Sequence, residues 1–132
     1  MQYMLDTNIC IYIMKHHPPQ VRERLKNINM GDVLISGIVL AELWYGIGKS
    51  LHREKNRAAL EDFLNYCVMQ DWPREAAPVY GELRAALEKK GAVIGGNDLF
   101  IAAHAKYLGA TLVTNNIKEF KRVAGLKIEN WM

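Results

Sequence analysis

Three stretches of this sequence are almost free of charged side chains, and each contains a single carboxylate. These lone acids are Asp6 in residues 1–14, Glu42 in residues 33–48 and Asp98 in residues 91–105. At the chain's average of 23% charged residues, stretches of this combined length would hold about ten charges rather than three. Because an ionised carboxylate in apolar surroundings is costly unless it is paired or binds a cation, each acid is a candidate for a structural cap, an ion pair or a cation site.

Carboxylates that meet at one place repel one another, which raises the pKa of at least one of them unless a divalent cation neutralises them. A ligand set of oxygens without His or Cys favours Mg²⁺ or Mn²⁺ over zinc. The residue types therefore predict a magnesium or manganese site, provided that the fold brings the three acids together.

The element that must position Asp6 is a strand followed at once by a helix. A short apolar strand at residues 4–5 precedes Asp6, and an apolar helical run at residues 9–14 follows it. Thr7 and Asn8, which lie between, are residue types that cap helices. In open α/β sheets ligands bind at the carboxyl ends of the strands, so this pattern places Asp6 where a ligand is held.

The other two acids are predicted to lie on helices. Glu42 lies in a helix predicted for residues 38–45, which Gly46 and Gly48 are expected to end. Asp98 lies in the first turn of another helix, which opens after two glycines and closes at a third. Because strand ends and the helix starts that follow them cluster at one edge of a parallel sheet, all three acids are expected at that edge.

The rest of the chain alternates between short apolar strands and amphipathic helices. Further strands are predicted at residues 33–36, 67–69, 111–114 and 127–129, and further helices at residues 20–27, 54–66, 74–90 and 118–123. This alternation predicts a single α/β domain of residues 1–132, a three-layer α/β/α sandwich with a mostly parallel central sheet of four to five strands.

The composition is that of a folded globular protein. Half of the 132 residues are hydrophobic, and a net charge of +3 permits a polyanionic partner without requiring one. No run reaches the ~18 apolar residues of a membrane span. The N-terminus lacks the basic start and apolar core of a secretory signal, so a cytoplasmic location is expected. Cys10 and Cys67 stand alone in apolar segments, which predicts reduced thiols.

Each acid also has a purely structural interpretation. Asp6 would be a helix N-cap, Glu42 would pair with an arginine such as Arg84, and Asp98 would be a first-turn acid favoured by the helix dipole. Each alternative is reasonable alone, but the uniform negative sign of the three isolated charges favours a shared site.

Four segments carry a resemblance to a known family: Leu5–Asn8, Ser36–Gly46, Gly95–Ala105, and Val113–Asn116 with the nearby Glu119-Phe120. In this order and over nearly the whole chain, they resemble the PIN-domain ribonucleases, and more narrowly the VapC toxins of bacterial toxin–antitoxin pairs. The resemblance implies a Mg²⁺- or Mn²⁺-dependent endoribonuclease that cuts structured RNA, typically tRNA, and that a VapB-type antitoxin inhibits. A homodimer and larger hetero-oligomers with the antitoxin are also expected.

The resemblance carries the family's catalytic and metal-binding acids over to Asp6, Glu42 and Asp98. Where many members place a fourth acid, this chain has Asn116, whose amide oxygen coordinates a metal without bringing a charge. Glu119, one turn later, is a weaker substitute. In such a site the cation polarises the scissile phosphate and lowers the pKa of the attacking water.

Supporting roles fall to neighbouring polar and basic residues. Candidates for orienting the carboxylates or a phosphate are Thr7, Asn8 and Thr114. Candidates for contacts with the RNA backbone are Lys49, Arg53, Lys55 and Arg57, in the most basic window of the chain. Trp44 and Tyr45 are predicted to pack in the core or at a dimer contact rather than to stack on a base.

Two other functions are compatible with the sequence. One is a catalytically idle PIN-like module that binds RNA or a partner, which the intact Asp6, Glu42 and Asp98 argue against. The other is a DNA nuclease with the same carboxylate site. A phosphotransferase of the haloacid-dehalogenase type would need a second Asp two residues after Asp6, where Asn8 stands.

Overall fold

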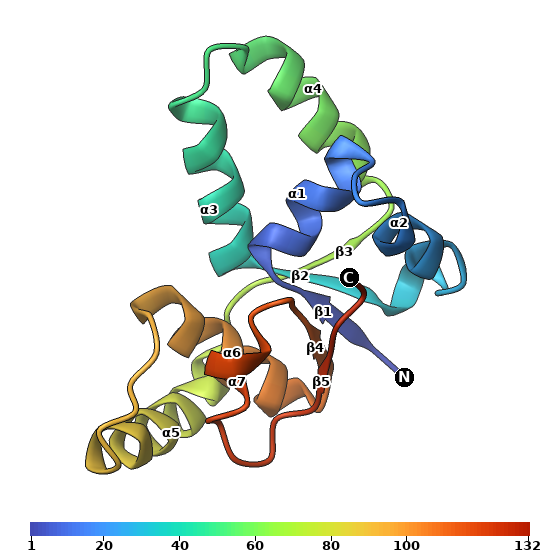
Figure 1. Cartoon of the computed structure of the whole chain (residues 1–132). Helices are drawn as coiled ribbons and strands as arrows, with labels where there is room; N and C mark the ends of the chain where they lie inside the picture. Colours follow the sequence, from blue (N-terminus) through green and yellow to red (C-terminus); the bar gives the residue numbers. More distant parts are fainter.

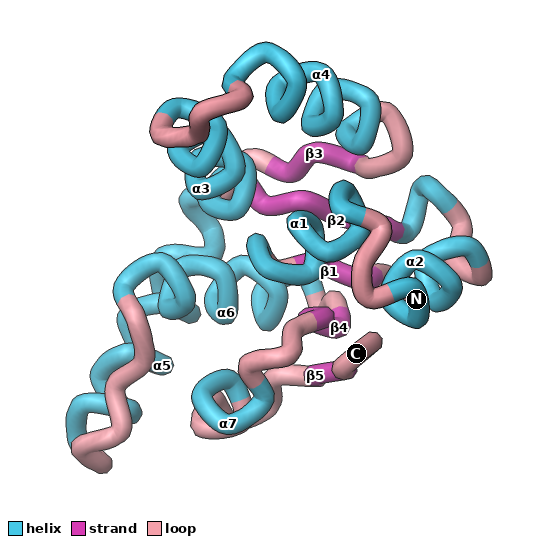
Figure 2. Tube along the Cα trace, turned by 45° about the horizontal axis from the view of Figure 1, so that its top comes forward, coloured by secondary structure: helices cyan, strands magenta, loops and turns pink.

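Five parallel strands in the order β3-β2-β1-β4-β5 form the central sheet of this protein (Figures 1 and 2). The computed structural model describes all 132 residues. The strands are β1 (Tyr3–Leu5), β2 (Val33–Ser36), β3 (Val68–Gln70), β4 (Thr111–Val113) and β5 (Ile128–Glu129). The helices are α1 (Thr7–Lys15), α2 (Pro19–Lys26), α3 (Gly37–Gly48), α4 (Arg53–Leu64), α5 (Ala77–Lys89), α6 (Gly96–Leu108) and α7 (Ile117–Phe120), with 3₁₀ turns η1 (Met30–Asp32) and η2 (Arg74–Ala76). The predicted α/β/α sandwich is confirmed, and its sheet is parallel throughout.

The strand order reverses at β1, because β2 and β3 follow on one side of it and β4 and β5 on the other. Right-handed crossovers then place the helices before β3 on one face and those after β3 on the other. In agreement, α1 packs against α2, α3 and α4, whereas α5 packs against α6 (Figure 1). The carboxyl end of β1 is therefore the topological switch point, where open α/β sheets bind ligands.

The core lies on both faces of the three central strands. Met4 and Leu5 of β1 pair with Leu34 of β2 and with Leu112 and Val113 of β4, and none of these side chains is exposed. Strands that are buried on both faces read as continuous apolar runs, which is why the sequence pattern located them. None of the helices combines the length and the apolar character that a membrane span requires.

Some local predictions were wrong. Gly46 does not end the third helix, because α3 runs through it and ends only at Gly48, with its cap at Lys49. Neither glycine has a positive φ, and packing of α3 against α4 carries the helix past residues of low propensity. Trp44 and Tyr45 are 40% and 68% exposed, so core packing is excluded for both.

The helix predicted to begin at Arg74 starts as a 3₁₀ turn, and α5 begins at Ala77. Pro78 then lies in the first turn, where its missing N–H is tolerated. Cys10 and Cys67 are free thiols, as predicted. Burial raises the pKa of both, that of Cys67 to about 12, so neither is a reactive thiolate.

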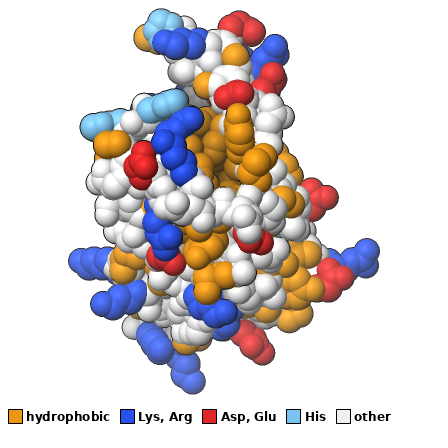
Figure 3. Space-filling model, turned by 90° about the vertical axis from the view of Figure 1, so that its right-hand side faces the viewer, with side chains coloured by type: hydrophobic (Ala, Val, Ile, Leu, Met, Phe, Trp, Pro, Cys, Tyr) orange, Lys and Arg blue, Asp and Glu red, His pale blue; other side chains and the backbone are white.

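An apolar groove of about 350 Å³ lies between α1, α2 and α4, and we call it the α1–α2–α4 groove. Its apolar lining includes Ile13, Leu25 and Phe63, and its polar rim includes Arg22 and Asp62. Figure 3 shows hydrophobic side chains gathered in a hollow on this side of the molecule, with Lys, Arg and His side chains at the margin. A groove of this size is large enough to receive apolar side chains of another molecule.

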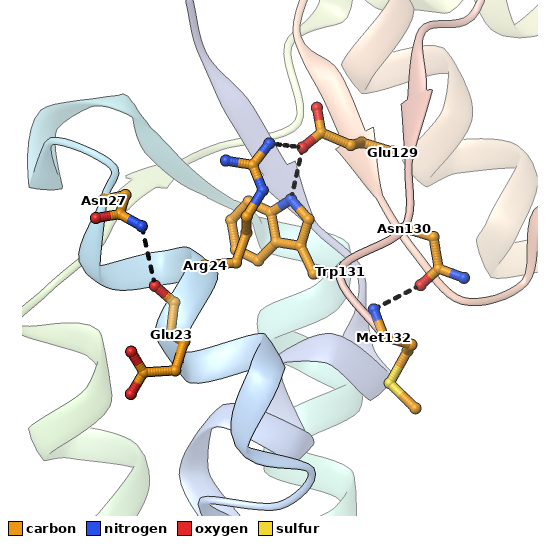
Figure 4. A network of polar contacts seen from close by, with 7 residues as sticks. All are labelled: Glu23, Arg24, Asn27, Glu129, Asn130, Trp131 and Met132. Atoms are coloured by element: carbon orange, nitrogen blue, oxygen red, sulfur yellow. Dashed lines mark hydrogen bonds and ion pairs between the residues drawn. The ribbon is translucent and has the colours of Figure 1, made fainter.

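The C-terminal segment is tied to α2 and to the sheet by a polar and aromatic network (Figure 4). Glu129 forms an ion pair with Arg24 and accepts a hydrogen bond of 2.9 Å from Trp131 Nε1. The Arg24 guanidinium also lies 5.8 Å from the centre of the Trp131 ring, and that ring packs against Tyr3 of β1. All charges in this network therefore have partners.

Candidate functional site

Asp6 joins the end of β1 to the start of α1. Its backbone N–H donates to the carbonyl of Val113 at 3.0 Å, and its Oδ1 accepts from the backbone N–H of Ile9 at 3.0 Å. The structural interpretation of Asp6 as a helix cap is thus confirmed, and Asp6 itself caps the helix instead of Thr7 or Asn8. The same contacts hold the carboxylate at the switch point.

The electrostatics of Asp6 are not those of an ordinary cap. The side chain is only 6% exposed, and burial raises its pKa. Hydrogen bonds from the Thr114 hydroxyl and the Ile9 backbone oppose this effect, and the nearby charge of Glu42 adds to it. A cap normally favours the ionised form of its carboxylate, so here desolvation and a neighbouring negative charge outweigh the cap.

Glu42 lies half-buried on α3, and its Oε1 accepts a hydrogen bond of 2.7 Å from Thr7 Oγ1. This contact links the first turn of α1 to α3 across 35 positions of the sequence. The alternative in which Glu42 pairs with Arg84 is wrong, because Arg84 binds Glu88 on its own helix and donates to Tyr80. Thr7 is therefore in place to orient Glu42.

Asp98 lies half-buried in the first turn of α6, and its pKa is raised to about 6. Burial is the main cause, followed by the negative charges of Glu42, Glu119 and Asp6. The fold thus brings the three predicted acids into one electrostatic site at the switch point. Glu119 adds a fourth charge to it, although its sequence position alone makes it only a weak candidate.

Asn116, the predicted substitute for a fourth acid, is half-buried just before α7. Its backbone N–H donates to Thr114 Oγ1 at 2.9 Å, and its side chain forms no hydrogen bond with the protein. Thr114 consequently interacts with both Asp6 and the turn that precedes Glu119.

The Asn8 side chain is exposed, and only its backbone N–H contributes to the surroundings of Asp6.

None of the four acids forms an ion pair, because the ion pairs of the structure all lie elsewhere. No group of three His, Cys, Asp or Glu side chains is close enough to enclose a metal ion. The acids thus form an open anionic site rather than a closed cage. Mg²⁺ is usually held by one or two carboxylates and keeps several waters, so an open set of oxygen donors fits this ion.

A buried pair that the sequence analysis missed links the two helices that carry Glu42 and Asp98. Ser36 caps α3 by accepting from the backbone N–H of Ile38, and its Oγ lies 2.8 Å from His104 Nδ1 on α6. Both side chains are fully buried, and burial lowers the pKa of His104, which keeps the ring neutral. The only advance signal was a single histidine within an apolar helix.

The basic window is only partly free to bind another molecule. The Lys49 ammonium lies 4.7 Å from the centre of the Tyr45 ring, and Arg57 forms two ion pairs along α4, at 3.6 and 3.7 Å. Arg53 and Lys55 have no ion pair or hydrogen bond. Of the four predicted cations, these two are therefore the ones whose charge is uncompensated.

Comparison with known proteins agrees with the fold. The family model of the PIN domain matches residues 3–126. Ribonuclease VapC2 of Rickettsia felis is 50% identical over 132 residues, which cover 99% of this chain and 98% of that protein. The tRNA(fMet)-specific endonuclease VapC of Salmonella typhimurium is 44% identical over 131 residues, with coverage of 99% and 98%.

A solved structure is similar over the full length of both chains. The crystal structure of VapBC2 from Rickettsia felis bound to a DNA fragment from their promoter superposes with a TM-score of 0.95 at 48% identity. The parallel sheet with acids at its switch point is thus a PIN domain. The chain belongs to the PIN-domain family and, within it, to the VapC ribonucleases.

Proposed function

We propose that this chain is a Mg²⁺- or Mn²⁺-dependent endoribonuclease toxin that cuts structured RNA of the tRNA class. The observation that carries this proposal is the group of acids without a cation around Asp98, whose pKa is raised to about 6. Like charges held together destabilise the folded chain, and a divalent cation relieves that repulsion. The name of the 44% identical relative, a tRNA(fMet)-specific endonuclease, supports tRNA as the substrate class.

Asp6, Glu42 and Asp98 are the proposed metal ligands and catalytic acids, with Glu119 beside them and Asn116 at the margin. When bound, the ion supplies Lewis-acid chemistry, since it polarises the scissile phosphate and makes a bound water acidic. The contribution of the chain is to hold acidic oxygens, already partly stripped of water, at one edge of the sheet.

Four further side chains keep these acids in position. Thr7 holds Glu42 through a 2.7 Å hydrogen bond, and Thr114 donates to Asp6. The Ser36–His104 pair joins α3 to α6 inside the core. Groups that orient metal ligands in this way typically change activity or metal affinity by about 10- to 100-fold when they are removed.

The RNA backbone is proposed to contact Arg53 and Lys55, because their charges are free, and Lys49 and Arg57 less strongly. Phosphate contacts of this kind supply affinity that weakens as salt is added, without reading the base sequence. Specific recognition of RNA usually targets single-stranded loops with splayed bases, which suits a loop of a structured RNA.

A VapB-type antitoxin is the proposed partner and inhibitor, since the similar solved structure is a VapBC complex. The uncompensated carboxylates would attract an antitoxin arginine, which binds a carboxylate in a bidentate manner. The α1–α2–α4 groove, lined by Ile13, Leu25 and Phe63, would receive its apolar side chains. A homodimer is also proposed, and the exposed Trp44 and Tyr45 are candidates for its contact surface.

The direct test is cleavage of bulk tRNA by the purified chain in Mg²⁺, in Mn²⁺ and in EDTA. Cleavage is expected only with metal, and Asp6→Ala and Asp98→Ala should each abolish it without unfolding the protein. Activity that persists in EDTA or in both variants contradicts the proposal. Preferential cleavage of DNA would identify a DNA nuclease, and binding without cleavage an idle binding module.

The toxin part of the proposal has a separate test in cells. Expression of the chain alone should arrest growth, and co-expression of its VapB-type partner should relieve the arrest. Asp6→Ala should remove the toxicity and leave partner binding in place, because the groove lies outside the acid site. A wild-type chain that is soluble, abundant and harmless would contradict this part.

A further inference from the structure

A second groove, of about 570 Å³, lies between α1, α3 and α4, and we call it the α1–α3–α4 groove. Glu42 is part of its lining, so the groove opens beside the acid site. In Figure 1 the hairpin of α3 and α4 extends away from the sheet over α1, which leaves these three helices to form the walls. Met14 and Ala59 line both this groove and the α1–α2–α4 groove, so the two adjoin.

The charges of this groove are arranged asymmetrically. Glu42 is its only acid, and Lys15 of α1 and Lys55 of α4 are its only cations. Both lysines are exposed to solvent, and neither forms an ion pair or a hydrogen bond. Two cations from different helices that line one groove make it attractive to an anion.

The spacing along α1 separates Lys15 from Asp6. Lys15 comes nine residues after Asp6, which corresponds to about 13 Å along the helix axis. This is several times the spacing of about 3.4 Å between stacked nucleotides, so it spans more than one nucleotide of a single strand. Lys15 is therefore placed for a phosphate further along the strand than the one nearest Asp6.

The walls of the groove suit a base rather than a second phosphate. Ile11, Leu43 and Ile47 supply apolar surface, and a base out of its stack is held between apolar or aromatic side chains. The Asn56 side chain also lines the groove and makes no hydrogen bond within the protein, so its amide is free to bind a base edge. The volume is within the range of pockets that hold small ligands.

We propose that the α1–α3–α4 groove is a nucleotide subsite that holds single-stranded RNA beside the cut, with Lys15 and Lys55 on its phosphates and a splayed base against the apolar wall. The proposal rests on the proposed ribonuclease function and extends it by placing the substrate strand. A protein segment is the less suitable occupant of this groove, because the groove combines two unpaired cations with a single acid, whereas the adjoining α1–α2–α4 groove already offers an apolar docking surface.

The first experiment measures binding of bulk tRNA to chains that carry Asp98→Asn, so that the RNA is not cut. Lys15→Ala and Lys55→Ala should each weaken binding by about three- to fivefold, as expected for an exposed ion pair. Each should also lower the slope of log affinity against log salt by about 1. Lys89→Ala is the matched control, since Lys89 is exposed on α5, outside both grooves.

The second experiment fills the groove without removing a charge. Gly46 lines the groove, and a Cβ added there meets no atom within 4 Å, so the Gly46→Leu side chain starts into open space, and the substitution raises helix propensity. In the otherwise wild-type chain, this variant should raise KM for tRNA by about tenfold and leave kcat within about twofold. Gly48→Leu, two residues later in α3 and outside the groove, is the control and should change neither value.

Unchanged tRNA binding in both lysine variants, or an unchanged KM in Gly46→Leu, would overturn the proposal. So would a Gly46→Leu chain that cuts tRNA normally but no longer binds a VapB-type partner, because the groove would then hold a protein. If the wild-type chain does not cut tRNA at all, the ribonuclease function fails. Binding to the Asp98→Asn chains decides the subsite independently of that result.

Discussion

Acidic side chains occur in two contrasting regions of this molecule. Where α2 meets β5, Glu129 is bound by Arg24 and by Trp131 Nε1, so its charge is compensated on two sides (Figure 4). At the carboxyl end of β1, Asp6 and Asp98 lie among other acids, without a cation, and both have raised pKa values. Acidic side chains are thus paired with partners in one region and left without a cation in the other.

The difference teaches which region joins elements of the fold through paired charges and which carries charges without a partner. The α2–β5 network attaches the C-terminal segment to the sheet. Its charged side chains, Arg24 and Glu129, are paired with each other. In the acid site the fold holds the acids in place, since Asp6 caps α1 and Glu42 accepts a hydrogen bond from Thr7. None of these acids forms an ion pair within the chain.

The largest expected effect is on the rate of tRNA cleavage, which should depend on the acid site but not on the α2–β5 network. Asp98→Asn preserves side-chain size and removes a charge, and we expect a loss of at least ~1000-fold in the rate of tRNA cleavage, equivalent to about 4 kcal/mol of transition-state stabilisation. Glu129→Gln is the matched change in the compensated region and should keep full activity. Similar losses in the two variants, measured at equal folded fractions, would show that the distinction is wrong.

The free energy of unfolding should depend on the two regions in the opposite way: a change in the α2–β5 network should lower it, and removal of a charge from the acid site should raise it. Trp131 is 4% exposed and joins Arg24, Glu129 and Tyr3, so Trp131→Ala should lower the free energy of unfolding by about 3 kcal/mol through lost contacts and a cavity. Asp98→Asn should instead stabilise the metal-free chain at pH 7. Urea unfolding monitored by circular dichroism measures both changes. Trp131→Phe is the control, because it removes the Nε1 hydrogen bond but keeps a large aromatic ring in the same place.

The pH dependence gives a smaller but distinctive effect. Asp98 has an ordinary pKa of 3.8 when unfolded and a pKa of about 6 when folded, so folding favours the protonated form. Its contribution to stability is complete below pH 4 and is lost as the pH rises through 6. Because the side chain is half-exposed, solvent screening reduces this to about 1 kcal/mol. The melting temperature of the metal-free wild type should fall relative to Asp98→Asn between pH 4 and 6, and parallel curves would contradict this.

The smallest expected change concerns the margin of the acid site. Asn116→Asp would add a charge there, and we expect it to lower the Mn²⁺ concentration at half-maximal cleavage by about threefold. Glu119→Gln, which removes a charge that acts on Asp98, should raise it by a similar factor. If both variants give the wild-type metal titration, neither residue belongs to the metal site.

The sequence by itself determined the main elements and the three acids. Charges are costly in apolar segments, so Asp6, Glu42 and Asp98 stood out without any knowledge of the fold. The buried parallel strands were visible as continuous apolar runs, and their alternation with helices implied the sandwich and the shared edge. These features depend on local composition and periodicity, which are present in the sequence itself.

Only the tertiary structure decided which residues surround those acids. The Thr7–Glu42 hydrogen bond and the Ser36–His104 pair join positions 35 and 68 residues apart, and the charge of Glu119 acts on Asp98 only because the fold brings these two positions near each other. The α1–α3–α4 groove likewise exists because α3 continues through Gly46, against local propensity. Such contacts follow from how helices pack across the sheet, and no local sequence pattern encodes that packing.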